Sequence, residues 1–260
     1  MALAREVGWP DDAADWRVIH EAARVLGALR DGQLVGQGVL AAYEPNAGMI
    51  AKMIVGPSAQ RRGIGAAILD ALVADAERRA LGTLGLVATP FGRPLYESRG
   101  FAVTGEVAVF IGTPVPDRPG EPSSGLADID EAIAFERRFV TCSRTAMLRG
   151  RHREASATAI CRGPDGAARG FALANAKGPY TQVGPLIAES EGVARTLAHA
   201  VFGSNPGVVR IDVPGEHTAF RAWLRGLGLR ETAVRPEMAR GGALPWQVPQ
   251  RFALATQAWG

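Results

Sequence analysis

The chain has 260 residues and a formal net charge of +3, and 47% of its residues are hydrophobic, enough for the core of one large domain or two of ordinary size. Its arginines are scattered, no apolar run could span a membrane, and Cys142 and Cys161 have neither disulfide nor metal-site spacing. These features argue against a nucleic-acid-binding, membrane or exported protein, and we expect a cytoplasmic protein that binds no metal.

Hydrophobic periodicity and turn residues divide the first part of the chain into alternating helices and strands. Asp31-Gly32 is a strong turn signal and predicts a hairpin between the first two strands. In chain order, the pattern predicts helices over 2–7 and 12–22, strands over 25–29, 34–40 and 49–55, a helix ending at 80, a strand around 86, a short helix over 93–99 and a strand over 101–111.

The most informative segment follows the strand that ends at Val55 and precedes an amphipathic helix. It reads Gln60-Arg61-Arg62-Gly63-Ile64-Gly65-Ala66. A strand, a glycine-containing turn and a helix start direct several backbone N–H groups to one point, which suits a phosphate. The two glycines permit a tight turn and keep side chains away from a pyrophosphate. The segment is neither a Walker loop nor a three-glycine dinucleotide loop, and an ordinary strand-to-helix turn is the alternative.

Two segments together resemble the GNAT superfamily of acyl-CoA-dependent N-acyltransferases. Residues 60–66 match the family's Gln/Arg-x-x-Gly-x-Gly/Ala loop, and Leu95-Tyr96-Glu97-Ser98-Arg99-Gly100-Phe101 is similar to its Leu-Tyr-x-x-x-Gly-Phe element. The resemblance implies an α/β (α+β) fold with a mixed, mostly antiparallel sheet flanked by helices. It also implies acetyl-CoA, or another short acyl-CoA, as co-substrate, and no metal. The family's opening strand has no counterpart before the first helix.

The same resemblance implies the site residues. Tyr96 would be the general acid for the CoA thiolate, and a ring packed in the core is the alternative. Thr89 stands where the family often has a cofactor-contacting asparagine, and Trp9 and Trp16 would either border the acceptor pocket or pack in the core. A backbone N–H of the central strand would stabilise the oxyanion. The other cofactor contacts implied are Met53, Ile54, Val55, Gln60, Arg61, Arg62, Gly63, Ile64, Gly65 and Ala66.

The sequence does not identify the base that deprotonates the acceptor amine. The strand over 49–55 offers only Lys52, so the proton would leave through water or to a group of the second half. Asp212 and His217 flank a strand end there, and His217 has a suitable intrinsic pKa. We interpret Asp212 as a strand-end residue and His217 as a polar residue at a helix start, because nothing in the sequence places them near Tyr96.

The second half of the chain repeats the order of the first. Proline and serine residues predict a linker over 113–125. After it, the pattern predicts a helix over 128–140, strands over 155–161, 170–176 and 180–187, a helix over 191–202, a strand over 208–213 and a helix over 217–227. An internal repeat of one fold explains this order.

The repeat lacks the chemistry of the first half. Acidic residues stand at its loop and would repel a pyrophosphate, and no glycine opens the backbone at the two equivalent positions. The predicted correspondences are Gly184-Pro185 with Gly56-Pro57, Leu224 with Tyr96, and Ala188, Glu191 and Val193 with Gln60, Gly63 and Gly65. We therefore expect the second half to bind no CoA, which leaves one active centre in each chain.

The tandem layout and the closing Arg251-Phe252-Ala253-Leu254 resemble a bacterial two-domain GNAT subfamily. We expect a catalytic domain over 1–112, the linker over 113–125 and a degenerate GNAT-like domain over 126–260. The predicted function is transfer of an acetyl group from acetyl-CoA to a primary amine of a small molecule by direct attack, in a monomer or homodimer that contacts neither nucleic acid nor membrane. The alternatives are a non-catalytic acyl-CoA sensor and a protein-lysine acetyltransferase.

Overall fold

The computed structural model describes residues 2–9, 13–115, 125 and 128–260, so most of the predicted linker lies outside the described residues. Its helices are α1 (Ala2–Glu6), α2 (Ala13–Ala22), the 3-10 turn η1 (Pro57–Ala59), α3 (Ile64–Arg78), α4 (Arg93–Glu97), α5 (Ile129–Glu136), α6 (Thr145–Arg153), α7 (Glu191–Gly203) and α8 (Thr218–Gly226). Its strands are β1 (Ala23–Arg30), β2 (Gln33–Tyr43), β3 (Ala47–Val55), β4 (Thr83–Val87), β5 (Ala102–Gly112), β6 (Ala157–Arg162), β7 (Ala168–Lys177), β8 (Tyr180–Ala188), β9 (Val209–Pro214), β10 (Arg230–Arg240) and β11 (Arg251–Ala253).

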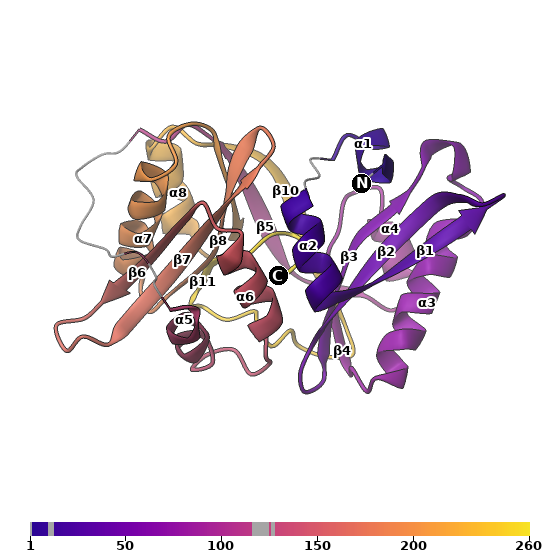
Figure 1. Cartoon of the computed structure of the whole chain (residues 1–260), viewed down its shortest axis with the longest axis horizontal. Helices are drawn as coiled ribbons and strands as arrows, with labels where there is room; N and C mark the ends of the chain where they lie inside the picture. Colours follow the sequence, from indigo (N-terminus) through magenta and orange to yellow (C-terminus); the bar gives the residue numbers. More distant parts are fainter. Residues whose placement is uncertain (1, 10–12, 116–124, 126–127) are drawn as a thin grey trace.

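The strands form one eleven-stranded sheet in the order β1-β2-β3-β4-β10-β5-β9-β8-β7-β6, with β11 paired to β8. Only β3 with β4 and β8 with β9 are parallel among the described pairs. Each half contributes a hairpin, a further strand, a long helix and a parallel strand in the same order. These features confirm the predicted mixed, mostly antiparallel sheet and the internal repeat. Figure 1 shows the two halves side by side, the first from indigo to magenta and the second from pink to yellow.

β5, the last strand of the first half, and β10 of the second half lie at the centre of the sheet, and each is next to a strand of the other half. β10 pairs with both β4 and β5, and β5 pairs with β9 as well. Backbone hydrogen bonds therefore join the two halves, and side chains from both meet above the central strands. The sequence pattern does not predict β10, because Pro236 and several charged residues interrupt its apolar positions.

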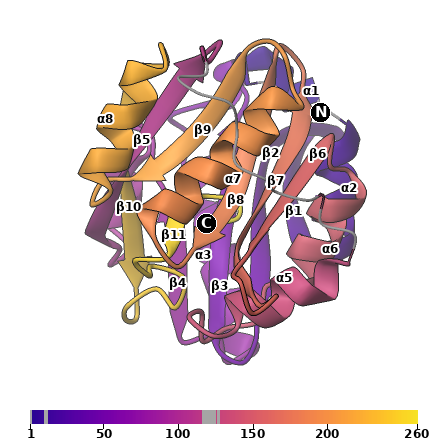
Figure 2. The same ribbon diagram turned by 90° about the vertical axis from the view of Figure 1, so that its left-hand side faces the viewer.

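Helices cover both faces of the sheet because the side chains of a strand alternate between its faces. In the first half, α3 packs against Leu40 and Ile50, whereas α2 packs on the opposite face against Val39 and Met49. α7 and α8 cover the outer face of the second half (Figure 2). The first half thus presents its α2 face toward the second half.

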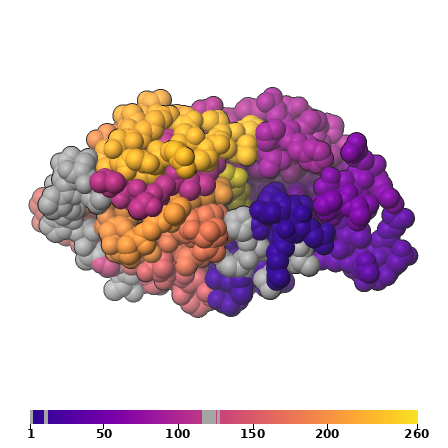
Figure 3. All heavy atoms as spheres, turned by 90° about the horizontal axis from the view of Figure 1, so that it is seen from above, coloured from indigo at the N-terminus to yellow at the C-terminus, as the bar shows by residue number. Residues whose placement is uncertain are grey.

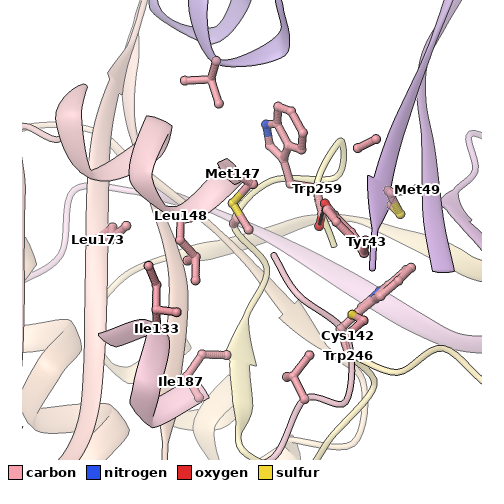
Figure 4. Close-up of a cluster of buried hydrophobic side chains, with 14 of the residues drawn as sticks. Tyr43, Met49, Ile133, Cys142, Met147, Leu148, Leu173, Ile187, Trp246 and Trp259 are labelled. Atoms are coloured by element: carbon pink, nitrogen blue, oxygen red, sulfur yellow. Dashed lines mark hydrogen bonds between the residues drawn. The ribbon is translucent and has the colours of Figure 1, made fainter. Parts of the chain in front are cut away.

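A core of buried side chains holds the halves together on that face. Tyr43 of β2, Met147 of α6, Trp246 and Trp259 gather there (Figure 4). The Tyr43 hydroxyl donates a hydrogen bond to the backbone oxygen of Trp259 at 2.8 Å. The sequence pattern does not predict α6. The helix predicted over 128–140 is α5, which ends earlier than predicted, at Glu136. These packed residues fix the position of α6 against α2 and so the walls of the space between the halves.

Candidate active site

A cavity of about 920 Å³ lies between the two halves. The first half lines it with α1's end, β3, the loop before α3, and α4, and the second half lines it with β8, β9, β10 and residues 256–258. Side chains of β5 complete the wall between them. From above, the surface is recessed between the halves beside the indigo N-terminal segment (Figure 3).

The cavity opens where β3 and β4 separate. These parallel strands pair over only three positions, from Ala47↔Thr83 to Met49↔Gly85. Beyond Met49 the edge of β3 that faces β4 has no strand partner among the described residues, and residues 50–55 line the cavity. The register against β2 also shifts at Lys52, whose φ of 50° is unusual for a non-glycine residue in a strand. Backbone N–H and C=O groups of β3 can therefore bind a ligand here.

The predicted phosphate loop closes one end of the cavity. Gly63 precedes the first turn of α3 with φ of 79°, and no side chain in the described part of the chain caps the helix. The first N–H groups of this long helix are thus available to an anion. The Gln60 side chain donates a hydrogen bond to the Val55 carbonyl at 3.0 Å and holds the loop against the strand end. All residues predicted to contact the cofactor line the cavity except Arg62; that they bind it remains a prediction.

Tyr96 lies in α4 and lines the cavity, although only 8% of it is exposed. Its ring packs against Phe101 with the centroids 6.1 Å apart, and burial raises the pKa of its hydroxyl to about 12. The described residues give this hydroxyl no hydrogen-bond partner, so it is available to a ligand. Thr89 also lines the cavity, and its Oγ1 accepts a hydrogen bond from the Gly92 N–H at 3.1 Å, which leaves the hydroxyl proton for donation.

The two tryptophans predicted near the acceptor occupy different environments. Trp9 lines the cavity and is 36% exposed. Trp16 is buried in the core between the halves, in contact with the His20 ring, and is not part of the cavity wall among the described residues. Trp9 therefore lies on the cavity wall, where its role toward an acceptor stays a prediction, whereas the core-packing alternative applies to Trp16.

A buried carboxylate gathers cationic side chains beside the cavity. Asp15 of α2 lies 2.5 Å from Lys177 and 3.4 Å from Lys52, and 3.5 Å from Arg151. Burial alone would raise the pKa of Asp15, but the neighbouring Lys177, Lys52 and Arg151 outweigh it and hold that pKa well below its ordinary value. The two lysines come from different halves and both line the cavity. This cluster therefore joins the halves and brings positive charge to the wall.

Asp212, interpreted from the sequence as a strand-end residue away from Tyr96, lies inside β9 and belongs to a second polar group on the cavity wall. Asp212 is fully buried and accepts hydrogen bonds from Arg210 at 3.0 and 3.1 Å. The Arg210 guanidinium also donates to the Tyr180 hydroxyl at 3.4 Å and lies 5.8 Å from the centre of its ring. In the sheet, Asp212 pairs with Val109, which lines the same cavity. These residues lie near the first half because β5 and β10 are exchanged between the halves: β10 pairs with β4 of the first half, and β5 pairs with β9 of the second. No sequence pattern predicts this exchange.

His217 serves the core of the second half. Its ring stacks on Phe252 with a centroid distance of 4.1 Å, and Nε2 lies 2.9 Å from the Arg251 carbonyl. Burial lowers its pKa, and it does not line the cavity. Within the described ranges, no cluster of His, Cys, Asp and Glu could hold a metal, and no helix is long and apolar enough to cross a membrane.

The second half closes the space that the first half leaves open. There, β11 lies along β8, and the Leu254 N–H donates to the Asp212 carbonyl on β9 at 2.9 Å. Only Glu189 and Ser190 connect β8 with α7, and the Ser190 hydroxyl caps the Val193 N–H at 3.4 Å. In the second half, the chain itself therefore fills the gap between the parallel strands and caps the start of the helix.

Two predicted correspondences between the halves can be compared directly. Gly184-Pro185 does not occupy the place of Gly56-Pro57, because it lies inside β8 at a register shift like that at Lys52 in β3. A Cβ atom on Gly184 would lie 1.9 Å from the Leu254 carbonyl oxygen, so the passing chain requires glycine. Leu224 and Tyr96 share one local feature, since each carbonyl accepts a hydrogen bond of 3.1 Å from the residue five positions later, but this bond also occurs at the end of α3, so their match stays a prediction.

Comparisons with known proteins agree with the repeat. Two family models, each described as an acetyltransferase (GNAT) domain, match residues 10–115 and 132–252. The chain is 24% identical over 267 residues to YitH of Bacillus subtilis, described as an uncharacterized N-acetyltransferase, with 100% of this chain and 94% of the relative covered. Among solved structures, it is similar to a putative acetyltransferase from Pyrococcus horikoshii, with a TM-score of 0.80, 21% identity, and 95% and 83% of the two chains covered. A tandem GNAT protein from the clavulanic acid biosynthesis pathway has a TM-score of 0.65 and 16% identity, with 94% and 93% covered.

Proposed function

The chain belongs to the GNAT acetyltransferases and carries two GNAT domains in tandem, and from this premise we propose that it transfers an acetyl group from acetyl-CoA to a primary amine of a small molecule by direct attack. One observation carries the proposal. The unpaired edge of β3, the loop before α3 and the Tyr96 side chain all line one cavity. These are the parts that an acyl transfer from a thioester needs in one place.

The residues present fit acetyl-CoA, which supplies an activated acetyl thioester. The start of α3 has no side-chain cap, whereas Ser190 caps α7, and so the first half retains the anion site that the second half has filled. The exposed edge of β3 beyond Met49 offers backbone groups to an extended ligand, as the edge of any sheet does. Both features support the first half as the only half that binds CoA.

Three groups would act on the reacting atoms. Backbone N–H groups of Met53, Ile54 and Val55 would donate to the thioester oxygen as it gains negative charge, a role worth roughly 10²–10³ in rate elsewhere. Tyr96 keeps its proton at neutral pH because burial raises its pKa to about 12, so it can hold the proton that the departing thiolate needs. Direct attack needs a neutral amine, and the cationic lysines and arginines on the wall favour that form of an amine placed beside them.

The walls supplied by both halves support a small acceptor. The second half lines the cavity with β8, β9 and β10, and Trp9 lies on the first-half wall. A protein-lysine acetyltransferase needs room for a polypeptide along the site. A non-catalytic sensor needs the same cofactor contacts but not Tyr96, which the described structure places on the wall without a structural hydrogen bond.

The proposal is tested with a panel of amines. Release of the CoA thiol and the mass of the acetylated product are measured together, and the affinity for acetyl-CoA is measured by calorimetry. We expect turnover of at least one small primary amine. Tight acetyl-CoA binding without turnover of any amine would identify a sensor, and acetylation of lysine peptides in preference to every small amine would identify a protein acetyltransferase.

A further inference from the structure

The wall of the cavity that comes from the second half is rich in positive charge. Lys177, Arg210 and Arg235 line it, and Lys52 of the first half adjoins them through Asp15. Among the described residues, the carboxylates beside these four cations are Asp15 and Asp212. The described part of this wall therefore has an excess of two positive charges.

These cations are held in fixed positions. The Arg210 side chain is only 19% exposed, and its contacts with Asp212 and Tyr180 orient the guanidinium. Lys177 is 8% exposed and lies against Asp15. Arg235 is half-buried on β10 and forms no ion pair with a described residue. Partly buried and oriented cations interact with a ligand more strongly than surface cations do, because water screens them less.

The phosphates of CoA do not account for this charge. The pyrophosphate loop follows β3, whereas Arg210 lies on β9, and β4, β10 and β5 lie between these strands. At a strand spacing of roughly 4.8 Å, the two positions are about 19 Å apart along the sheet. The second-half cations therefore face the acceptor end.

We propose that the acceptor carries an anionic group, a carboxylate or a phosphate, close to its amine, and that Arg210, Lys177 and Arg235 bind that group. This rests on the proposed acyl transfer and names its substrate class. A guanidinium and an ammonium together form charge-assisted hydrogen bonds with either anion. The same charges disfavour polyamines and lysine side chains, and they lower the pKa of the acceptor amine so that more of it is neutral. One set of residues thus selects the acceptor and prepares it for attack.

The test compares amines that differ only in the anion. Amino acids are paired with their amides, and ethanolamine phosphate is paired with ethanolamine, with spermidine as the polycation. Binding to the CoA complex is measured by calorimetry, and kcat/KM is measured by thiol release. We expect the anionic member of at least one pair to bind and react about 10- to 100-fold better. A preference within the amino acid pairs would indicate a carboxylate, and a preference within the ethanolamine pair would indicate a phosphate. The proposal would be overturned if the amides, ethanolamine and spermidine bound as well as the anionic amines or better.

A variant locates the effect on this wall. Arg235→Gln should raise the KM of the anionic acceptor about tenfold and leave the KM for acetyl-CoA unchanged. Arg230→Gln is the matched control, because Arg230 lies on the same strand but is exposed and outside the cavity wall. Equal acceptor KM values in the two variants would contradict the proposal. The double variant Arg210→Gln/Asp212→Asn removes the buried pair together and should also lose the preference for the anion.

The outcomes separate this inference from acyl transfer itself. Anion-selective binding without turnover of any amine would refute the transferase and support the anion site. Turnover of neutral amines with no preference for an anionic partner would support the transferase and refute the anion site.

Discussion

Replacing Tyr96 by phenylalanine removes one hydroxyl group from the cavity wall and keeps the ring that packs against Phe101. Since the described residues give that hydroxyl no partner, we expect the free energy of unfolding to change by less than about 1 kcal/mol. If the hydroxyl supplies the proton to the thiolate, kcat falls by about 10²–10⁴-fold, or roughly 3–5 kcal/mol in activation free energy. The loss of activity would then far exceed the loss of stability.

The assay follows thiol release at saturating acetyl-CoA, with acetyl-CoA affinity measured separately by calorimetry. The matched control is Tyr43→Phe, which removes a buried hydroxyl that donates to the Trp259 carbonyl at 2.8 Å. That variant should lose about 0.5–1.5 kcal/mol of stability and keep its kcat. An unchanged kcat in Tyr96→Phe would refute the acid role and leave the tyrosine as a packing residue.

The pH profile gives a second readout of the same role. Burial raises the pKa of Tyr96 to about 12, so the hydroxyl remains protonated throughout the range below that value. The rate should therefore rise with pH as the acceptor amine loses its proton, and it should not fall again by about pH 10. A decrease in rate above neutral pH that occurs in the wild-type enzyme but not in Tyr96→Phe would contradict the raised pKa of Tyr96.

Gly63→Ala should weaken acetyl-CoA binding, because alanine at φ of 79° costs about 1–2 kcal/mol in a loop that no neighbouring atom obstructs. The control is Gly203→Ala, which changes an equally open position in a helix. Equal acetyl-CoA affinities of the two variants by calorimetry would contradict the loop assignment. Asp15→Asn should destabilise the fold by about 3–5 kcal/mol in urea unfolding at pH 7, because it leaves buried cations without their carboxylate. Since the folded-state pKa of Asp15 is lowered, this contribution is complete above the unfolded value of about 4 and is lost as the pH falls toward the folded-state pKa. The wild type should therefore lose more stability than Asp15→Asn between pH 5 and pH 3, and parallel losses would argue against an ionised Asp15.

The elements with regular patterns were predictable from the sequence. The helix after Gly63 shows apolar spacing that matches its buried face, and the Asp31-Gly32 turn lies between β1 and β2. α6 has no such signal, because its sequence is dominated by basic residues and it begins after Arg144 without a side-chain cap. Its Gly150 instead allows close contact with Val18 of α2, where a Cβ atom would lie 2.8 Å away. Tertiary packing, which cannot be predicted from a local sequence pattern, therefore stabilises α6.

The candidate site was predictable on one side only. Local motifs locate the phosphate loop and Tyr96, because a loop and a short helix carry their geometry in adjacent residues. Arg210 and Lys177 lie far away in sequence and reach the cavity only through the exchange of β5 and β10 and the packing of α2 against α6. From the sequence alone, Asp212 therefore resembles an ordinary strand-end residue, although it accepts a hydrogen bond from Arg210 on the cavity wall.

The two halves use the gap between their parallel strands differently. In the first half, β3 and β4 separate after Met49 and the cavity occupies the gap. In the second half, β8 and β9 separate after Val183, and β11 occupies the gap, anchored by the buried pair of Arg251 with Glu237. A chain segment in that position satisfies the same backbone groups that a ligand would otherwise bind. The second half therefore contributes charged residues to the cavity of the first half although its own strand gap is filled, and the proposed acceptor site would use those residues.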